Sequence, residues 1–278
     1  MNYRLFLITT VAALNAFVTA NGHQSPVHAV QDLTERIEAE GPTARLLVAR
    51  AYERQSLRNW EAAVVDFKAA LELNPRSRVA MNGCAQSLMR LGDFSQAELM
   101  AQKGIALDGD VTGQAPFCAI LATIYAHQKR WVEALDYWGL ALKIPQPEID
   151  WFLGEAEALK QLSRYAEQVK ALSNARQRNP SVVLHRAWVR ALVDAEEFET
   201  AFSEIETGIN KSRWKSSWLL LRAQIHGQKQ NYDEQRADAS TALSEINSRL
   251  SPEHPDPYLV LDAARALAFM GQREKALE

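Results

Sequence analysis

The hydrophobic positions of this chain are organised around an aromatic residue that recurs at an almost constant spacing. The intervals between successive occurrences are 34, 37, 34, 33 and 34 residues, and the positions are Trp60, Phe94, Trp131, Tyr165, Phe198 and Tyr232. A fixed period of this length is typical of proteins built from repeats, each of which buries its apolar face against its neighbours. The pattern therefore predicts a stack of similar repeats rather than one or two globular domains.

Small residues follow the aromatic residue at helical spacing. Several repeats carry an alanine three residues after it, and a further small residue comes seven positions later, so that both lie on one helix face two turns apart. The first set is Ala63, Ala97, Ala134 and Ala201, and the second is Ala70, Gly104, Ala141, Ala175, Gly208 and Ala242. Small side chains allow a neighbouring helix to approach closely. We expect looser packing where Gln168 and Gln235 occupy the first of these positions.

A second helical segment precedes each aromatic residue and has a small residue of its own. These residues are Ala49, Ala85, Ala122, Ala156, Ala223 and Ala264, with Val189 as the exception. Several repeats end on a proline that stops a helix, as at Asn74-Pro75 and Asn179-Pro180. Each repeat is therefore predicted to be a pair of antiparallel helices.

Two repeats carry the fullest set of these residues. One has Ala85-Gln86-Ser87-Leu88 followed by Gly92-Asp93-Phe94 and Ala97, and the next has Ala122-Thr123-Ile124-Tyr125 followed by Trp131, Ala134 and Ala141. They resemble the tetratricopeptide repeat, a helix-turn-helix module of about 34 residues. The resemblance implies an all-α fold, a right-handed α-solenoid of antiparallel helix pairs. We place six repeats in 42–250, a proline-rich linker at 251–257 and a partial seventh repeat at 258–278, and we expect two extra turn residues near Ser56-Leu57 in the first repeat.

The first twenty residues differ from the rest of the chain. A start containing Arg4 is followed by an uncharged, mostly apolar run of 14 residues, 5–18, and by the small residues of Val18-Thr19-Ala20. This order is that of a secretory signal peptide. The run is shorter than the roughly 20 residues that cross a membrane as a helix, so an uncleaved anchor is the less favoured alternative. We expect cleavage of 1–20, a polar lead over 21–41, no membrane span in the mature chain, and a location in the bacterial periplasm or outside the cell.

The composition narrows the possible functions. The chain has 31 Lys and Arg against 34 Asp and Glu, a net charge of −3, whereas nucleic-acid binding needs clustered basic charge, so we expect no nucleic-acid partner. Hydrophobic residues make up 47% of the chain, which is typical of a folded protein. The two cysteines, Cys84 and Cys118, lie in apolar helical patterns, where buried free thiols are the favoured interpretation and a disulfide bond between them is the alternative.

No arrangement of catalytic residues is recognisable. No two of the six histidines have the spacing of a helical zinc site, and neither a phosphate-binding glycine loop nor a nucleophilic serine motif is present. We therefore expect no catalytic residue, no metal centre and no cofactor, and we interpret the chain as not being an enzyme. One alternative is open: cleavage after Ala20 would create the N-terminus Asn21-Gly22-His23, which can bind Cu(II) or Ni(II) in a square plane.

The resemblance implies that the first helix of each repeat lines a concave groove for a peptide or a helix of a partner. The groove residues that we carry over are Arg50, Arg54, Asn82, Gln86, Arg90, Lys160, Arg186, Arg190 and Arg265. Acidic residues lie on the same faces, so the basic excess is modest; they are Glu53, Glu157, Asp194 and Asp262. The pattern with which some members clamp a C-terminal carboxylate is absent, because Leu46 and Arg50 stand at its first two positions.

These observations predict a non-enzymatic scaffold that binds a protein or peptide partner in its groove. The arginines favour an acidic partner that lies across the first, second and fifth repeats, since guanidinium groups hold carboxylates through paired hydrogen bonds. An alternative hypothesis is that the chain is the adaptor part of a longer polypeptide with a catalytic or membrane domain beyond Glu278.

Overall fold

The computed structural model describes residues 25–278, with the exception of residues 108, 252, 273, 275, 277 and 278. The signal peptide expected over 1–20 and the possible metal-binding tripeptide Asn21-Gly22-His23 lie outside the described residues. The described residues form α-helices joined by short connections and contain no strand, so the all-α class is confirmed. None of the described helices has the length and apolar character needed to cross a membrane.

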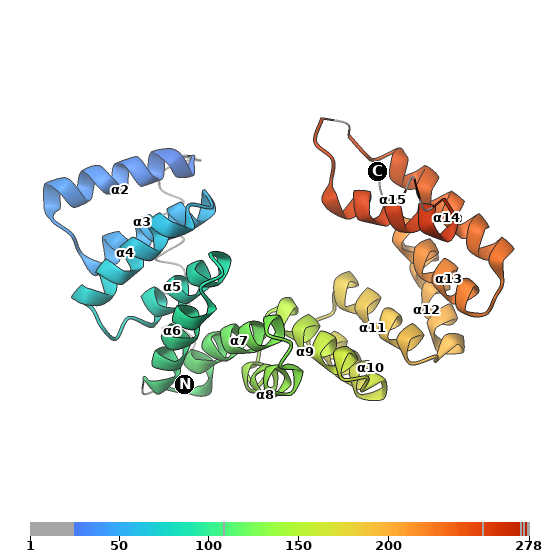
Figure 1. Ribbon diagram of the computed structural model, residues 1–278, viewed down its shortest axis with the longest axis horizontal. Coiled ribbons are helices and arrows are strands. Elements are labelled where there is room, and N and C mark those ends of the chain that lie inside the picture. The colour runs from blue at the N-terminus through green and yellow to red at the C-terminus, as the bar shows by residue number, and fades with distance from the viewer. Residues whose placement is uncertain (1–24, 108, 252, 273, 275, 277–278) are drawn as a thin grey trace. The chain divides into compact units, whose positions relative to one another are not determined.

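The chain divides into two compact units, residues 1–145 and residues 146–278, and each is described by itself. The helices of the N-terminal unit are α2 (Pro26–Glu40), α3 (Ala44–Ser56), α4 (Trp60–Leu73), α5 (Arg78–Arg90), α6 (Phe94–Ala106), α7 (Val111–His127) and α8 (Trp131–Ala141). Those of the C-terminal unit are α9 (Ile149–Gln161), α10 (Tyr165–Arg178), α11 (Val182–Asp194), α12 (Phe198–Lys211), α13 (Ser216–Gln228), α14 (Tyr232–Asn247) and α15 (Pro257–Phe269). Successive helices run back and forth within each unit (Figure 1). We call the first helix of each repeat the inner helix and the second the outer helix.

Each outer helix begins at the recurring aromatic residue, from Trp60 in α4 to Tyr232 in α14. The residue just before it donates its N–H group to the carbonyl oxygen five positions earlier, as Asn59 does to Arg54 at 2.9 Å. This bond and a residue with positive φ form the Schellman ending of a helix. The positive-φ residue lies two positions before the aromatic residue, and it is Gly92 with φ 78° in one repeat and a larger residue in the others: Arg58, Lys129, Ser163, Glu196 and Gln230, with φ between 56° and 61°.

The turn of the first repeat has the same length as the other turns. Helix α3 ends at Ser56 and the positive-φ residue is Arg58, two positions before Trp60, just as Gly92 is two positions before Phe94. The expectation of two extra turn residues near Ser56-Leu57 is therefore wrong. The physical reason is that Arg58 adopts the left-handed conformation and closes the turn as Gly92 does, so the turn needs no extra residues.

The small residues form the contacts between helices that the pattern predicted. All the alanines and glycines assigned to the outer helices are buried. A Cβ atom at Gly104 of α6 would lie 2.3 Å from the ring of Phe117 in α7, and one at Gly208 of α12 would lie 2.5 Å from the ring of Trp218 in α13. The absence of a side chain at these positions is therefore what lets the next inner helix pack an aromatic ring against the backbone.

The two glutamines in small positions are accommodated differently. Gln235 of α14 faces Gly227 of α13, where a Cβ atom would lie 2.4 Å from the Gln235 amide nitrogen, so a glycine on the inner helix makes room for the larger side chain. Gln168 of α10 is buried, and its Oε1 atom has no hydrogen-bond partner among the described residues. A buried oxygen without a partner costs free energy, so the fourth repeat carries the larger penalty.

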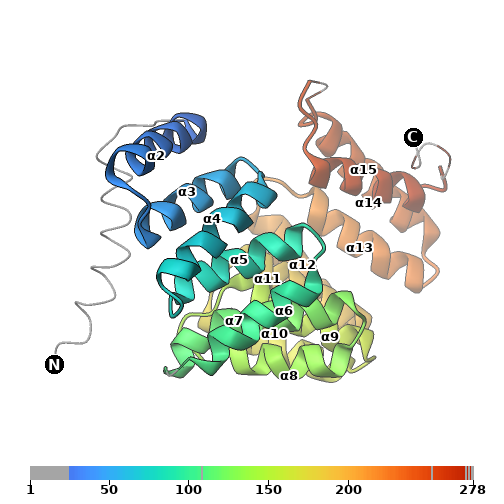
Figure 2. The same ribbon diagram turned by 60° about the vertical axis from the view of Figure 1, so that its left-hand side comes forward.

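Helix α2 lies in the segment that the sequence indicated only as a polar lead. Ser25 caps its N-terminus by accepting a hydrogen bond from the His28 N–H, and Pro26 occupies the first turn, where a missing N–H costs nothing. It contacts α3 in the way that an outer helix contacts the next inner helix (Figure 2). None of its residues is fully buried, so a polar helix covers the apolar face of the first repeat.

Both cysteines are free and buried. Burial raises the pKa of the Cys84 thiol to about 11, so this thiol stays protonated and unreactive near neutral pH. The favoured interpretation of two buried free thiols is confirmed.

Candidate functional site

The inner helices form the concave layer within each unit. Helix α5 contacts both α3 and α7 in the N-terminal unit, and α11 contacts both α9 and α13 in the C-terminal unit, where α13 also contacts α15. Within the described ranges, no two outer helices contact each other. Because the inner helices lie closer together than the outer helices, the surface that they share is the concave side of each unit.

On the inner helices α5 and α11, one row of side chains is left exposed or half-buried by the neighbouring helices. The row occupies the positions 12, 8 and 4 residues before the aromatic residue, so its members lie one helical turn apart on the same face. In α5 these residues are Asn82, Gln86 and Arg90, and in α11 they are Arg186, Arg190 and Asp194. We call such a row a groove stripe.

The groove stripe of α5 is open to solvent. Gln86 and Arg90 are exposed and Asn82 is half-buried. No hydrogen bond or ion pair with a described residue engages any of the three, and the Arg90 guanidinium lies 5.9 Å from the centre of the Trp60 ring. The structure therefore brings these three predicted residues together as one available polar surface.

The first repeat places its two arginines elsewhere. Counting back from Trp60 puts Val48, Tyr52 and Ser56 on the groove stripe of α3, so Arg50 and Arg54 lie two positions away from the row. This shift of two residues turns both guanidinium groups toward helix α4.

Both guanidinium groups of α3 converge on one carboxylate of α4. Arg50 donates from Nε and Nη2 to the two oxygens of Asp66 at 2.9 and 2.7 Å, and Nη1 of Arg54 lies 2.8 Å from Asp66 Oδ2. Arg50 also donates to the Thr34 hydroxyl of α2 at 3.1 Å. The Asp66 side chain is only 2% exposed, and its hydrogen bonds raise the pKa of the Arg50 guanidinium. Arg50 and Arg54 thus hold α2, α3 and α4 together, and a role of theirs in partner binding stays a prediction.

The C-terminal unit brings together Lys160, Arg186, Arg190 and Arg265, together with two of the acidic residues. Lys160 of α9 pairs with Asp194 of α11 at 2.7 Å, and Arg265 of α15 lies 3.7 Å from Asp262 on the same helix. The charges of Asp194, Asp262 and Arg265 all act on Arg190 of the α11 groove stripe.

Arg186 and Arg190 form no ion pair with any residue that the structure describes. The Nε atom of Arg186 is buried and has no hydrogen-bond partner. The pKa of the Arg190 guanidinium is lowered, first by burial and then by the positive charges of Arg265 and Arg186, which outweigh the negative charges of Asp262 and Asp194. The charged residues around Arg190 therefore act on it as a net positive charge.

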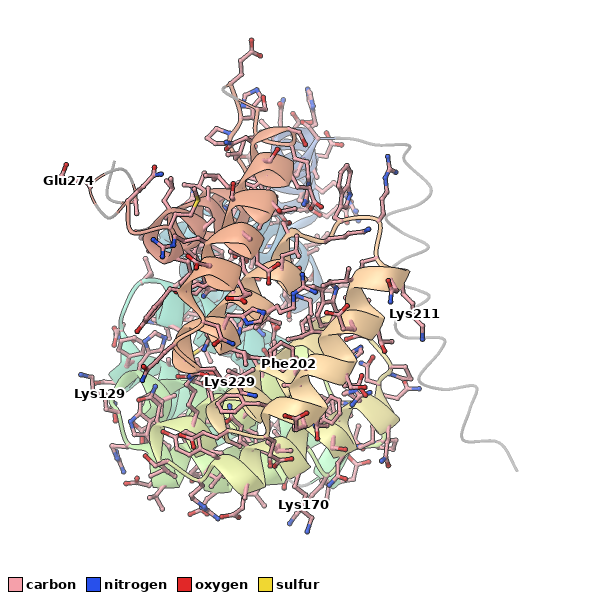
Figure 3. The ribbon with its side chains drawn as sticks, turned by 90° about the vertical axis from the view of Figure 1, so that its right-hand side faces the viewer. Lys129, Lys170, Phe202, Lys211, Lys229 and Glu274 are labelled. Carbon is pink, nitrogen blue, oxygen red and sulfur yellow. The ribbon has the colours of Figure 1, made fainter. Side chains whose placement is uncertain are left out.

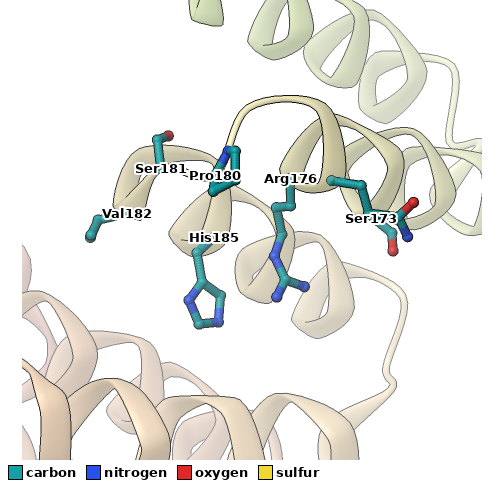
Figure 4. A pocket seen from close by; sticks show the side chains of 7 residues that line it. Ser173, Arg176, Pro180, Ser181, Val182 and His185 are labelled. Atoms are coloured by element: carbon teal, nitrogen blue, oxygen red, sulfur yellow. The ribbon is translucent and has the colours of Figure 1, made fainter.

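Two other surface features of the C-terminal unit lie where helices of neighbouring repeats meet. A shallow cavity of about 450 Å³ lies where α10 meets α11, and Arg176 and His185 project into it from the two helices (Figure 4). Arg176 stacks 3.9 Å from the centre of the Trp188 ring, and His185 lies 2.8 Å from Glu204. Lys229 sits 5.3 Å from the centre of the Phe202 ring (Figure 3). These side chains contribute to packing at the junctions between repeats.

Sequence reasoning missed Asp66, which is the residue that decides the role of Arg50 and Arg54. The signal that could have found it is the spacing of 16 residues between Arg50 and Asp66, which recurs between Arg222 and Asp238 in the sixth repeat. Arg222 binds the two Asp238 oxygens at 2.8 and 2.7 Å. Among the described residues, no cluster of three or more His, Cys, Asp or Glu side chains is arranged to hold a metal ion.

No model of a protein family matches the chain, and no curated protein matches it. Several solved structures are similar to it in fold. A tetratricopeptide repeat protein from Parabacteroides merdae has a TM-score of 0.59 at 14% identity, with 87% of this chain and 92% of that chain covered. The pilF protein of Pseudomonas aeruginosa has a TM-score of 0.58 at 17% identity over 71% of this chain and 89% of that chain. YrrB, described as a TPR protein with an unusual peptide-binding site, has a TM-score of 0.51 at 16% identity over 76% and 95% of the two chains.

These likenesses establish the fold. Together with the helix pairs and the periodic turns, they show that the chain is an α-solenoid with the tetratricopeptide-repeat fold.

Proposed function

We propose that this chain is a non-enzymatic scaffold that holds a segment of a protein partner on its groove stripes. The observation that carries the proposal is the row of Asn82, Gln86 and Arg90 on α5, whose polar groups form no hydrogen bond or ion pair with other described residues. Polar groups at regular spacing on a concave wall are suited to the backbone and side chains of an extended segment. The structural neighbour YrrB is described as having a peptide-binding site, and this supports the same use of the fold here.

The partner segment is acidic in this proposal. Basic side chains stand on the groove stripes of both units, at Arg90, Arg186 and Arg190, and Arg265 of α15 acts on Arg190 from nearby. Guanidinium groups bind carboxylates through two parallel hydrogen bonds, and a concave wall reduces the screening of their charge by solvent. The association should therefore weaken as salt concentration rises.

Site-specific photocrosslinking tests the location of the bound partner. A photoreactive residue at Gln86 should capture the partner, whereas the same residue at Gln102, an exposed glutamine of the outer helix α6, should not. Both positions are glutamines in the same unit, so the pair is matched in chemistry and differs in the helix layer. Capture that is equal at the two positions, or stronger at Gln102, would move the binding surface away from the groove stripe.

We further propose that the protein works outside the cytoplasm. The support is the sequence of the first twenty residues, with Arg4, the apolar run and the small residues ending at Ala20. N-terminal sequencing of the protein from the producing cell should begin at Asn21, and a chain that begins at Met1 would contradict export by cleavage.

A further inference from the structure

The charged side chains around α11 divide into two groups. Asp194 is engaged by Lys160 at 2.7 Å, and Asp262 has Arg265 at 3.7 Å. Each nearby carboxylate therefore already has a cation of its own. Arg186 and Arg190 are the two cations that remain, one helical turn apart on the same face.

An arginine in this state is costly to the folded chain. Both side chains are half-buried, and the Nε donor of Arg186 is shielded from solvent without a hydrogen-bond acceptor. A buried donor without an acceptor loses its hydration and gains nothing in return. Burial and the neighbouring arginines also lower the pKa of Arg190, which marks an environment that disfavours its charge. A bound anion would offset the penalty on the Arg190 charge, and it could accept hydrogen bonds from the terminal nitrogens of both guanidinium groups.

We propose that Arg186 and Arg190 form a subsite for a carboxylate group of the partner. The subsite rests on the proposed scaffold function and specifies where in the C-terminal unit an acidic segment is held. Two guanidinium groups one turn apart can each donate paired hydrogen bonds to a planar carboxylate, or share one carboxylate between them. The carboxylates of Asp194 and Asp262 offset part of the positive charge that acts on Arg190, so the excess is small and favours a singly charged group over a phosphate.

Short synthetic peptides can probe the subsite before the partner is known. The first probe is acetyl-tetraglutamate amide, which offers only side-chain carboxylates, and the second is acetyl-tetraalanine with a free C-terminal carboxylate. Acetyl-tetraglutamine amide is the uncharged control. The full chain should bind at least one of the two charged probes more tightly than the control in isothermal titration calorimetry, and the probe that binds identifies the source of the carboxylate.

The matched variants separate this subsite from general electrostatic attraction. Arg186→Gln with Arg190→Gln should weaken binding of the charged probe by roughly thirtyfold or more, since truncating a partner of a buried charged hydrogen bond costs a large part of the affinity. Arg176→Gln with Arg213→Gln makes the same change in net charge away from the groove stripe, and it should leave binding within about twofold. Circular dichroism on both variants confirms that the helices are intact, and the single variant Arg190→Gln replaces the double one if the latter loses helicity.

Three outcomes can be told apart. Loss of probe binding in the groove variant alone supports the subsite. Equal loss in both double variants, or no preference of the unaltered chain for either charged probe over the control, overturns it. If the subsite fails while crosslinking from Gln86 still captures a partner, the scaffold function stands and only its carboxylate contact at α11 is removed.

Discussion

The arginines of α3 and those of α11 show how a shift of two residues along a helix changes what a side chain does. Arg50 and Arg54 lie off the groove stripe and bind the buried Asp66, whereas Arg186 and Arg190 lie on it and find no described carboxylate. The residue type is the same, and both helices are inner helices of one fold. Whether an arginine is structural or available for a partner is therefore set by its position relative to the aromatic residue of its repeat.

Removal of the Asp66 carboxylate, which Arg50 and Arg54 share, should lower the stability of the chain more than any other change considered. In Asp66→Asn two guanidinium groups, with side chains only 14% and 21% exposed, lose their counterion. Breaking a buried ion pair from one side costs about 3 to 5 kcal/mol, so the free energy of unfolding from urea titration should fall by that amount. Glu61→Gln on the same helix is exposed and should change it by less than about 0.5 kcal/mol. A loss below 1 kcal/mol at Asp66 would mean that water replaces the carboxylate.

The equivalent pair of the sixth repeat should respond in the same direction but less. Arg222 binds Asp238 with the same paired geometry, yet their side chains are 25% and 11% exposed and Glu206 gives Arg222 a second acceptor. We expect Asp238→Asn to lower the free energy of unfolding by about 1 to 3 kcal/mol. An effect larger than that of Asp66→Asn would show that exposure does not rank these two pairs.

The sequence contained enough information to predict the helix pairs but not the roles of the arginines. The aromatic residue located every outer helix because its spacing is a property of the repeat itself. In the first repeat two extra turn residues were expected, whereas Arg58 closes a turn of ordinary length, and nothing in the identity of an arginine indicates a positive φ. That small error put Arg50 and Arg54 on the wrong helix face.

Long-range partners were the second limit of prediction. Helix α2 carries a short apolar stripe of Val30, Leu33 and Ile37, but it lacks the recurring aromatic residue that marks the other outer helices, so the repeat pattern gave no signal for it. The neutralisation of Arg50 depends on Asp66, which lies on another helix. By contrast, the row of Asn82, Gln86 and Arg90 was predictable because one helix alone determines it.

Replacement of a groove arginine tests whether Arg190 contributes to the stability of the chain when no partner is bound. Arg190→Met keeps the length of the side chain and removes a charge that burial disfavours, so the free energy of unfolding should stay constant or rise by up to about 1 kcal/mol. Arg50→Met should instead lower it, because Asp66 loses its paired hydrogen bonds. Urea titrations of the two variants in parallel give the sign of each change. A loss of stability in Arg190→Met would show that this arginine is structural after all.

The smallest effect concerns the turns, where the repeats differ in the residue that takes the positive φ. Gly92 occupies this position in the N-terminal unit, and Ser163 occupies it in the C-terminal unit with φ 56°. A residue other than glycine costs roughly 1 to 2 kcal/mol in this conformation, while glycine costs about 0.4 to 1 kcal/mol through the greater freedom of the unfolded chain. Ser163→Gly should therefore raise the free energy of unfolding by about 0.5 to 1 kcal/mol, and Gly92→Ser should lower it by a similar amount. Ser163 is exposed and a Cβ atom at Gly92 would meet no atom within 4 Å, so neither change disturbs packing, and opposite signs in the two titrations isolate the backbone effect. Equal signs would mean that the serine is held by an interaction outside its turn.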